Sequence, residues 1–342
     1  MSTNQIKPSF QENRTVLGKV LPLNTPYTAL IDVSDVCNFR CNYCFRASGS
    51  DIKAPGYRNN VLMSWENFTC AIDQLTEFPE QVKRISLSHN GESLCNPRLP
   101  EMVSYVKQKG LTGCCEFHTN GSLLTHEKSK QLVDAGLNRM IVSLQGVTAE
   151  KYKDVCHATV DMERFYDELS YLYSIKTEKL QVNIKIVKEA LEPGEEELFL
   201  EKYGKVADRV FIERVVPLWG LENESEPDVQ WENKYGRKEK WQSCCPLLFY
   251  TIGVHPSGDI YPCSHIVPPF KLGNVSETTL KQAWESTKRK EFLQQMLREG
   301  RGTCEECANC YIPQNTIMTD ADRIDEYREE ILVRMKKVFP FL

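Results

Sequence analysis

The segment DVCNFRCNYCFRAS, residues 35–48, places Cys37, Cys41 and Cys44 at the spacing C-x3-C-x2-C. It follows an apolar, β-branched run at residues 28–33 that predicts a buried strand, so one short loop can present all three thiols to a single cluster. Three thiolates leave one iron of a [4Fe–4S] cube without a protein ligand, whereas a structural zinc site normally has four protein ligands. No His or Cys stands nearby in the sequence to supply the fourth. The segment therefore favours a cluster with one open iron, and a zinc knuckle is the alternative.

Beyond this loop, short apolar runs alternate with longer amphipathic stretches as far as about residue 215, which predicts repeated βα units and a parallel sheet. We expect six strands, at residues 28–33, 84–88, 115–119, 140–144, 182–187 and 209–213. Ser64 and Thr125 are suited to cap the helices that follow them, and Gly136 stands where a helix end favours positive φ. Such repeats form an open sheet or a barrel, and in both the chemistry collects at the C-terminal ends of the strands.

Four short motifs follow four successive expected strands, and together they resemble the motifs of the radical S-adenosylmethionine (SAM) superfamily. The cysteine loop, with Tyr43 as the aromatic of C-x3-C-x-aromatic-C, is similar to that family's cluster motif. The other three are His89-Asn90-Gly91-Glu92-Ser93, similar to a Gly-Gly-Glu-Pro stretch, Thr119-Asn120-Gly121, similar to Thr-Asn-Gly, and Ser143-Leu144-Gln145-Gly146, similar to Ser-x-Asp-Gly. The chain departs from the family pattern at Asn90, Ser93 and Gln145.

The resemblance implies an α/β fold, a partial (β/α)6 TIM-like barrel, with a [4Fe–4S] cluster on Cys37, Cys41 and Cys44. Its open iron would bind the amino and carboxylate groups of SAM, and the reduced cluster would release a 5′-deoxyadenosyl radical that removes a hydrogen atom from a C–H bond. Glu92 would meet the SAM ammonium, for which a carboxylate is a suitable partner. The expected SAM-binding residues are Tyr43, Asn90, Gly91, Glu92, Asn120 and Ser143.

A second group of cysteines lies near the C-terminal end: Cys244, Cys245, Cys263, Cys304, Cys307 and Cys310. Residues 251–263 have the pattern of a hairpin with Pro-Ser-Gly-Asp in its turn. The region resembles the SPASM or shorter twitch extension of radical SAM proteins, which holds auxiliary [4Fe–4S] clusters. A full SPASM extension needs seven or more cysteines for two clusters, so these six favour one. The resemblance to the 2-deoxy-scyllo-inosamine dehydrogenase type implies Cys245, Cys263, Cys307 and Cys310 as ligands, with Cys244 and Cys304 as rivals. A structural zinc site remains the alternative.

These motifs divide the 342 residues into an N-terminal extension (1–27), a radical SAM partial barrel (28–216), a linker (217–243), a SPASM/twitch domain (244–313) and a C-terminal helix (314–342). The net charge of −5 argues against a general nucleic-acid binder, which needs clustered Lys and Arg. We find neither an export signal nor a membrane-spanning stretch, so we expect a cytoplasmic, metal-binding protein with no nucleic-acid or membrane partner.

An auxiliary cluster saturated by four thiolates can only accept or relay an electron, which suits oxidation. We therefore expect a radical SAM oxidoreductase or epimerase that acts on a carbohydrate or cyclitol and receives electrons from flavodoxin or ferredoxin. Only about thirty residues precede the barrel, which favours this function over modification of a ribosomal peptide or protein side chain. A non-catalytic zinc-binding protein is the alternative of another class. His118 and Glu116 are candidate bases by position, and Cys95, Cys115 and Cys244 are candidate hydrogen-atom donors for epimerisation, although a structural role is commoner for each.

Overall fold

The computed structural model describes residues 14–46, 60–217, 231–264 and 266–338. Its main element is a nine-stranded sheet with the strand order β11-β10-β9-β1-β2-β3-β4-β5-β6. The strands of the N-terminal half are β1 (Thr28–Ile31), β2 (Arg84–Ser86), β3 (Cys115–Thr119), β4 (Arg139–Leu144), β5 (Gln181–Val187) and β6 (Arg209–Glu213). All six are parallel to their neighbours, and the sheet does not close. The expected α/β class and its six strands are confirmed.

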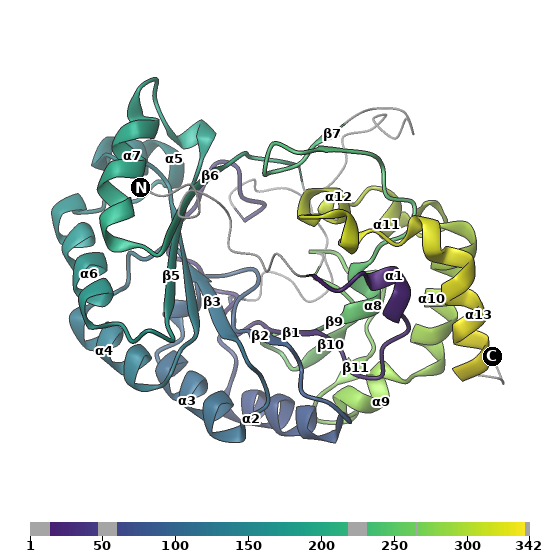
Figure 1. Cartoon of the computed structure of the whole chain (residues 1–342). Helices are drawn as coiled ribbons and strands as arrows, with labels where there is room; N and C mark the ends of the chain where they lie inside the picture. Colours follow the sequence, from purple (N-terminus) through teal and green to yellow (C-terminus); the bar gives the residue numbers. More distant parts are fainter. Residues whose placement is uncertain (1–13, 47–59, 218–230, 265, 339–342) are drawn as a thin grey trace.

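Helices cover one face of these strands, along the outer rim of the molecule in Figure 1. They are α2 (Trp65–Gln74), α3 (Leu99–Lys109), α4 (His126–Asp134), α5 (Ala149–Cys156), α6 (Met162–Ile175) and α7 (Glu195–Tyr203). Ser64 and Thr125 accept hydrogen bonds from the backbone N–H groups of Asn67 and Lys128, as expected of helix caps. Gly136 has a φ of 82° just after α4, which is the conformation expected from its position.

Strand residues alternate between two environments. Ile85, Phe117 and Ile184 are completely buried on the face covered by α2 to α7. His118 and Lys185 lie on the opposite face, which we call the inner face of the sheet. Apolar side chains thus attach the helices, while polar side chains of neighbouring strands meet on the inner face.

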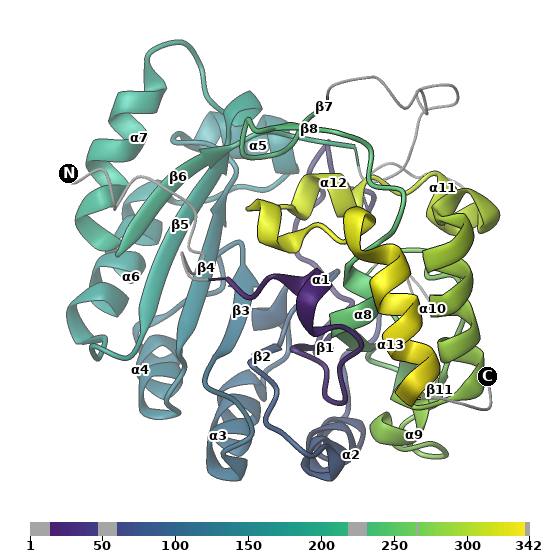
Figure 2. The same cartoon turned by 45° about the vertical axis from the view of Figure 1, so that its right-hand side comes forward.

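The C-terminal half continues the same sheet. Strand β9 (Thr251–Val254) pairs in parallel with β1, so that Thr28 lies opposite Thr251, and it forms the expected hairpin with β10 (Asp259–Tyr261). The edge strand is β11 (Gly273–Asn274). Figure 2 shows helices beyond this edge, including α10 and α13. The helices of this half, with the N-terminal α1, are α1 (Leu17–Val20), α8 (Leu247–Tyr250), α9 (Leu280–Trp284), α10 (Thr287–Glu299), α11 (Glu305–Ala308), α12 (Ile312–Thr316) and α13 (Arg328–Val338).

Two helical regions differ from the sequence-based expectation. The single helix expected at about 280–299 is divided into α9 and α10, because the Ser286 side chain caps a new helix by accepting from the Arg289 N–H. The last helix, expected from about residue 320, begins only at Arg328, after two short 3-10 turns. Among the described residues, no helix is long and apolar enough to cross a membrane.

Part of the segment expected to be a linker forms a hairpin of β7 (Trp231–Glu232) and β8 (Lys238–Glu239). The remainder of that linker, residues 218–230, lies outside the described residues. In both views the hairpin lies between the end of β6 and α12 (Figures 1 and 2). Backbone and side-chain bonds join it to both sides: the Arg214 N–H donates to the Lys234 carbonyl at 2.9 Å, and Asn233 donates to the Ile317 carbonyl at 2.9 Å.

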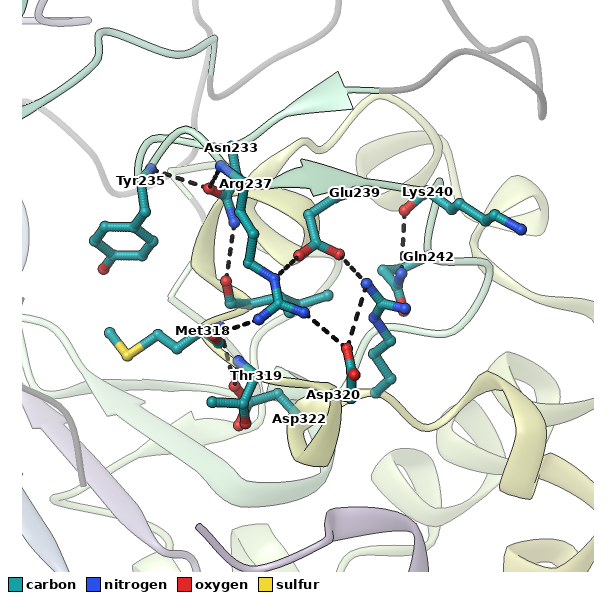
Figure 3. A network of polar contacts seen from close by, with 12 residues as sticks. Asn233, Tyr235, Arg237, Glu239, Lys240, Gln242, Met318, Thr319, Asp320 and Asp322 are labelled. Atoms are coloured by element: carbon teal, nitrogen blue, oxygen red, sulfur yellow. Dashed lines mark hydrogen bonds and ion pairs between the residues drawn. The ribbon is translucent and has the colours of Figure 1, made fainter. Parts of the chain in front are cut away.

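A buried carboxylate anchors the hairpin to the C-terminal half (Figure 3). Glu239, whose side chain is completely buried, accepts from Arg237 at 2.8 Å and from Arg323 at 2.5 Å. Arg237 also donates to Asp320 at 2.7 Å and to the Met318 carbonyl at 3.1 Å. Because breaking such a network would leave a buried charge unpaired, the hairpin is held firmly against residues 317–323.

Candidate functional site

The three N-terminal cysteines lie in the loop that follows β1, at the C-terminal edge of the sheet. Their thiols lie within electrostatic range of one another, and burial raises the pKa of the Cys37 thiol above its ordinary value. The C-terminal end of α5 supports the loop, because Arg40 and Asn42 donate backbone hydrogen bonds to the carbonyls of Cys156 and Val155 at 3.0 and 2.8 Å. A buried thiol with a raised pKa stays protonated unless a cation stabilises the thiolate.

Cys156 is a fourth thiol at this loop that sequence reasoning did not associate with it. Its thiol forms a hydrogen-bonded pair with that of Cys41, and it also donates to the Tyr152 carbonyl at 2.8 Å. The 111 residues between Cys44 and Cys156 gave no local signal of this proximity, which arises from the position of α5 beside the loop. Cys156 is satisfied by protein partners and packs in the main hydrophobic core.

Gly91 holds the Cys loop against the loop that follows β2. A Cβ atom at this position would lie 2.1 Å from the Ser34 carbonyl oxygen and 2.6 Å from that of Val36. The next residue, Glu92, donates its backbone N–H to the Val36 carbonyl at 2.7 Å. Glycine is therefore required here for close approach of two backbones, one of which leads directly into Cys37.

Glu92 joins the second and third motifs through its carboxylate. The residue is buried, with 3% of its surface exposed. Its Oε1 accepts from the Thr119 hydroxyl at 2.6 Å and from the Leu94 N–H at 3.0 Å, and its Oε2 accepts from the Asn120 N–H at 2.6 Å. Burial raises the pKa of Glu92 despite these bonds. Each carboxylate oxygen has two acceptor sites, so Oε2 can accept one further donor, such as an ammonium group.

Three of the four remaining expected SAM-binding residues, all but Ser143, occupy different places. Asn120 lies beside the Cys loop, because its side-chain amide donates to Asn38 at 2.9 Å. Asn90 donates from its backbone and side chain to Asp32 at 3.3 and 3.2 Å. Tyr43 is 39% exposed at the end of the loop.

The fourth motif presents an unsatisfied polar atom near the same edge of the sheet. The Gln145 side-chain amide donates to the Ser143 carbonyl at 3.1 Å, and its buried Oε1 has no hydrogen-bond partner among the described residues. A buried amide oxygen without a donor is unfavourable, so this position suits a hydroxyl or N–H group from a bound molecule.

Part of the second group of cysteines lines one hollow. Its lining includes Cys245, Cys263, Cys307 and Cys310, the four thiols implied by the resemblance, but neither Cys244 nor Cys304. Cys244 is buried elsewhere and donates its N–H to Asp325 at 2.7 Å, while the Cys304 thiol lies 3.2 Å from a Glu306 carboxylate oxygen. The Cys304 thiol also forms a hydrogen-bonded pair with that of Cys307, so this rival stays beside the hollow, and the choice of four ligands remains a prediction.

Arg301 is a buried cation beside this hollow that sequence reasoning missed. It is 1% exposed, lines the hollow, and interacts electrostatically with the thiols of Cys245, Cys307 and Cys310. Its guanidinium donates to the Gln242 carbonyl at 2.7 Å, and it lies over the Trp241 ring. A fixed positive charge at this position favours thiolates over thiols, as a cluster site requires.

Neither group of cysteines has the compact geometry of a single-ion site. No three His, Cys, Asp or Glu side chains in the described part of the chain converge closely enough to bind one metal ion. Four thiols around a hollow instead suit a larger inorganic group, such as an iron–sulfur cluster.

Two carboxylates on the inner face lie between pairs of cations. Glu116 pairs with Arg84 at 3.3 Å and Arg139 at 2.8 Å, so both of its oxygens are engaged and it is unsuited to act as a free base. Glu213 pairs with Lys185 of β5, and with Lys234 of the β7–β8 hairpin at 3.7 Å. Glu213 also lies within electrostatic range of the Tyr43 hydroxyl, which places this pair near the Cys loop.

His118 lies among these charges, and its side chain is exposed on the inner face. Desolvation by the surrounding strands, followed by the ammonium groups of Lys185 and Lys234, lowers the pKa of His118 below its ordinary value, so the imidazole is neutral at pH 7. Its ring has no hydrogen-bond partner in the described part of the structure. Cys115, a candidate hydrogen-atom donor, is completely buried on the opposite face, beneath the helices, which rules out that role.

Comparison with known families assigns both halves of the chain. Residues 31–188 match the model of the radical SAM superfamily, and residues 244–311 match the model of the SPASM iron–sulfur cluster-binding domain. Both groups of cysteines lie within these ranges.

Curated relatives match this chain over stretches of different length. The tungsten-containing aldehyde ferredoxin oxidoreductase cofactor-modifying protein of Pyrococcus furiosus is 28% identical over 160 residues, which are 46% of this chain and 42% of that protein. The AdoMet-dependent heme synthase of Methanosarcina barkeri is 25% identical over 340 residues, with 84% of this chain and 91% of that protein covered. The matches to three relatives, the Pyrococcus protein among them, span only 34% to 46% of those proteins.

Solved structures share the fold over most of the chain. BtrN, determined in complex with AdoMet and 2-DOIA, has a TM-score of 0.54 and 20% identity, with 86% of this chain and 97% of that chain covered. SuiB of Streptococcus suis, bound to S-adenosylmethionine, has a TM-score of 0.59 and 14% identity, with coverages of 92% and 79%. The chain belongs to the radical SAM superfamily and carries a SPASM domain, a combination whose cofactors are SAM, a [4Fe–4S] cluster and auxiliary iron–sulfur clusters.

Proposed function

We propose that this enzyme dehydrogenates or epimerises a polar small molecule of the carbohydrate or cyclitol class, bound on the inner face of the sheet. The observation that carries this proposal is the neutral, unpartnered His118 among ionic side chains, close to the motifs of a radical SAM site. Charged and hydrogen-bonding side chains suit a substrate rich in hydroxyl groups. A neutral imidazole can accept the proton that a hydroxyl loses when its carbon is oxidised to a carbonyl.

The residues present fit the cofactors of the family. Cys37, Cys41 and Cys44 would hold the first cluster, Glu92 has one acceptor site left for the SAM ammonium, and Gln145 offers an unsatisfied oxygen. Cys245, Cys263, Cys307 and Cys310 would hold one auxiliary cluster in their common hollow. When bound, these groups supply a 5′-deoxyadenosyl radical for hydrogen abstraction and an acceptor for the electron that the substrate loses.

The protein's own residues contribute binding, orientation and proton transfer. The Glu116 and Glu213 ion pairs fix the polar surface that a substrate would contact, and His118 would accept the hydroxyl proton. The parallel pairing of β1 with β9 joins the two cysteine sites through one sheet, which keeps them in a constant relation. Four thiols at the auxiliary site leave no place for substrate on that cluster, which favours an electron-accepting role.

Anaerobic reconstitution tests the proposal. The protein is incubated in deuterated buffer with SAM, dithionite and a panel of sugars, cyclitols and peptides, while 5′-deoxyadenosine and the mass change of each substrate are measured. Dehydrogenation predicts 5′-deoxyadenosine and a two-mass-unit loss in equal amounts, and epimerisation predicts deuterium uptake from solvent without a mass loss. If a peptide is modified while every polyol is unchanged, the proposal is wrong and the maturase alternative holds.

Substitution of His118 tests its role separately. His118→Gln should lower product formation by about a hundredfold, while 5′-deoxyadenosine still forms, because general base catalysis contributes on the order of 10²–10⁴. His126→Gln is the matched control, since that imidazole is half exposed and pairs with Asp167 on a distant helix. Equal product yields from both variants would exclude His118 as the base.

A further inference from the structure

The inner face carries an excess of positive charge around His118. Each of two carboxylates here contacts two cations. Glu116 contacts Arg84 and Arg139. Glu213 contacts Lys185 and Lys234. Each group therefore has one positive charge that its carboxylate does not neutralise. The side chains of Lys185 and Lys234 are only 15% and 27% exposed, so solvent screens this charge incompletely.

Lys234 reaches this surface because the β7–β8 hairpin brings it there. Its carbonyl accepts from the Arg214 N–H just after β6, and its ammonium lies 3.7 Å from Glu213. The opposite side of the hairpin is fixed by Arg237, Glu239 and Arg323 in the network of Figure 3. A long-range anchor thus holds a lysine over the end of β5 and β6, although Lys185 alone would neutralise Glu213.

We propose that the substrate carries an anionic oxygen group, a phosphate or a carboxylate, which binds between Lys185 and Lys234 beside His118. This inference rests on the proposed function and names its substrate class more narrowly. Two ammonium groups on separate elements can each donate to a different oxygen of one anion, and lysine is a common ligand of phosphate. Desolvation is the main cause of the lowered pKa of His118, and the bound anion would offset the further lowering by the two lysine charges.

The carboxylate of SAM is the other anion that enters this region. If the lysines bind the carboxylate of SAM, replacing them should weaken the binding of both SAM and the substrate. Under the proposal, replacing them should weaken the binding of the substrate alone. The affinity for SAM of each lysine variant, measured by equilibrium dialysis with the reconstituted protein, separates the two cases.

A fractionated extract identifies the charge of the substrate. Small molecules from the cells that naturally produce the protein are separated by anion exchange, and each fraction is incubated with reconstituted enzyme, SAM and dithionite. We expect a compound of the retained fraction to lose two mass units or to take up solvent deuterium. Loss of this activity after treatment with alkaline phosphatase indicates a phosphate, and resistance indicates a carboxylate.

The outcomes separate this inference from the proposed function. The proposal of an anionic substrate is wrong if the converted compound is in the unretained fraction, or if no compound of the retained fraction is converted. Either result leaves the proposed radical chemistry intact. Absence of 5′-deoxyadenosine under every condition contradicts the proposed function itself.

Variants then test the two lysines with the retained compound. Lys234→Met should raise its KM by about tenfold or more, because a charge-assisted hydrogen bond is lost, while Lys234→Arg should restore most of the affinity. Lys188→Met is the matched control, since Lys188 lies just beyond β5 and pairs with Glu196 on the exposed surface. An unchanged KM in Lys234→Met, or an equal loss of SAM affinity, would overturn the assignment.

Discussion

Substitution of Gly91 by alanine should damage both the stability and the SAM chemistry of the enzyme. The added Cβ would lie 2.1 Å from the Ser34 carbonyl oxygen, and since real Cβ atoms keep at least 3.0 Å, the two loops must separate by about 0.9 Å. Such overpacking costs roughly 1–3 kcal/mol, and loss of the bond from the Glu92 N–H to the Val36 carbonyl adds about 1 kcal/mol. We therefore expect a loss of roughly 2–4 kcal/mol in the free energy of unfolding.

The displacement also moves Glu92 relative to Cys37, so SAM cleavage should fall more steeply than stability alone would require. Denaturant unfolding gives the free energy, and 5′-deoxyadenosine formation by the reconstituted protein at a temperature where the variant is folded gives the activity. Gly113→Ala is the control, because a Cβ at Gly113 meets nothing within 4 Å. If Gly91→Ala matches this control in both measurements, the close backbone approach is not what positions the two loops.

Three other changes have defined outcomes. Replacing any one of four cysteines by alanine should lower the bound iron by about four atoms per chain: Cys245, Cys263, Cys307 or Cys310. The Cys244→Ser variant should keep its iron. If chemical analysis finds equal iron in all five variants, the proposed ligands are wrong. Glu239→Gln should destabilise the protein by roughly 2 kcal/mol, because Arg237 and Arg323 lose their buried counter-charge, and an unchanged unfolding midpoint in urea would contradict this. Burial, followed by the nearby Asp35 charge, raises the pKa of Asp32 to about 7, so the folded protein holds a proton that the unfolded chain releases. The contribution of Asp32 to stability should thus fall by about 2 kcal/mol as the pH rises from about 5.5 to 7, and Asp32→Asn should remove this decline; a parallel pH profile of the two proteins would show that Asp32 titrates normally.

The strands could be predicted from the sequence because their alternating environments leave a local pattern. The expected ranges of β3 and β6 agree with the structure, and the others differ by one or two residues at their ends. The Ser64 and Thr125 caps were predictable for the same reason, since a cap depends on residues within one helical turn. The β7–β8 hairpin was missed because two-residue strands are too short to show a period of two.

The cysteine spacings and the motif order identified both candidate sites, but contacts between distant segments could not be predicted. The parallel pairing of β9 with β1 joins residues more than 200 positions apart, and no local residue marks it. The pairing of Glu213 with Lys234 depends on a hairpin anchored by Arg323, and the approach of Cys156 to Cys41 depends on the position of α5. Such contacts follow from tertiary packing, whereas spacing within one loop reports only which side chains can meet locally.

The central claim is that a cluster on Cys37, Cys41 and Cys44 has one iron free to bind SAM. Electron paramagnetic resonance of the dithionite-reduced protein tests it most directly, using a Cys307→Ala/Cys310→Ala variant in which only the N-terminal cluster can contribute a signal. We predict a reduced [4Fe–4S] signal whose g-values shift when SAM is added, and loss of that signal when Cys41 is also replaced by alanine. A reduced protein with no such signal, or a signal that SAM leaves unchanged, would contradict the claim.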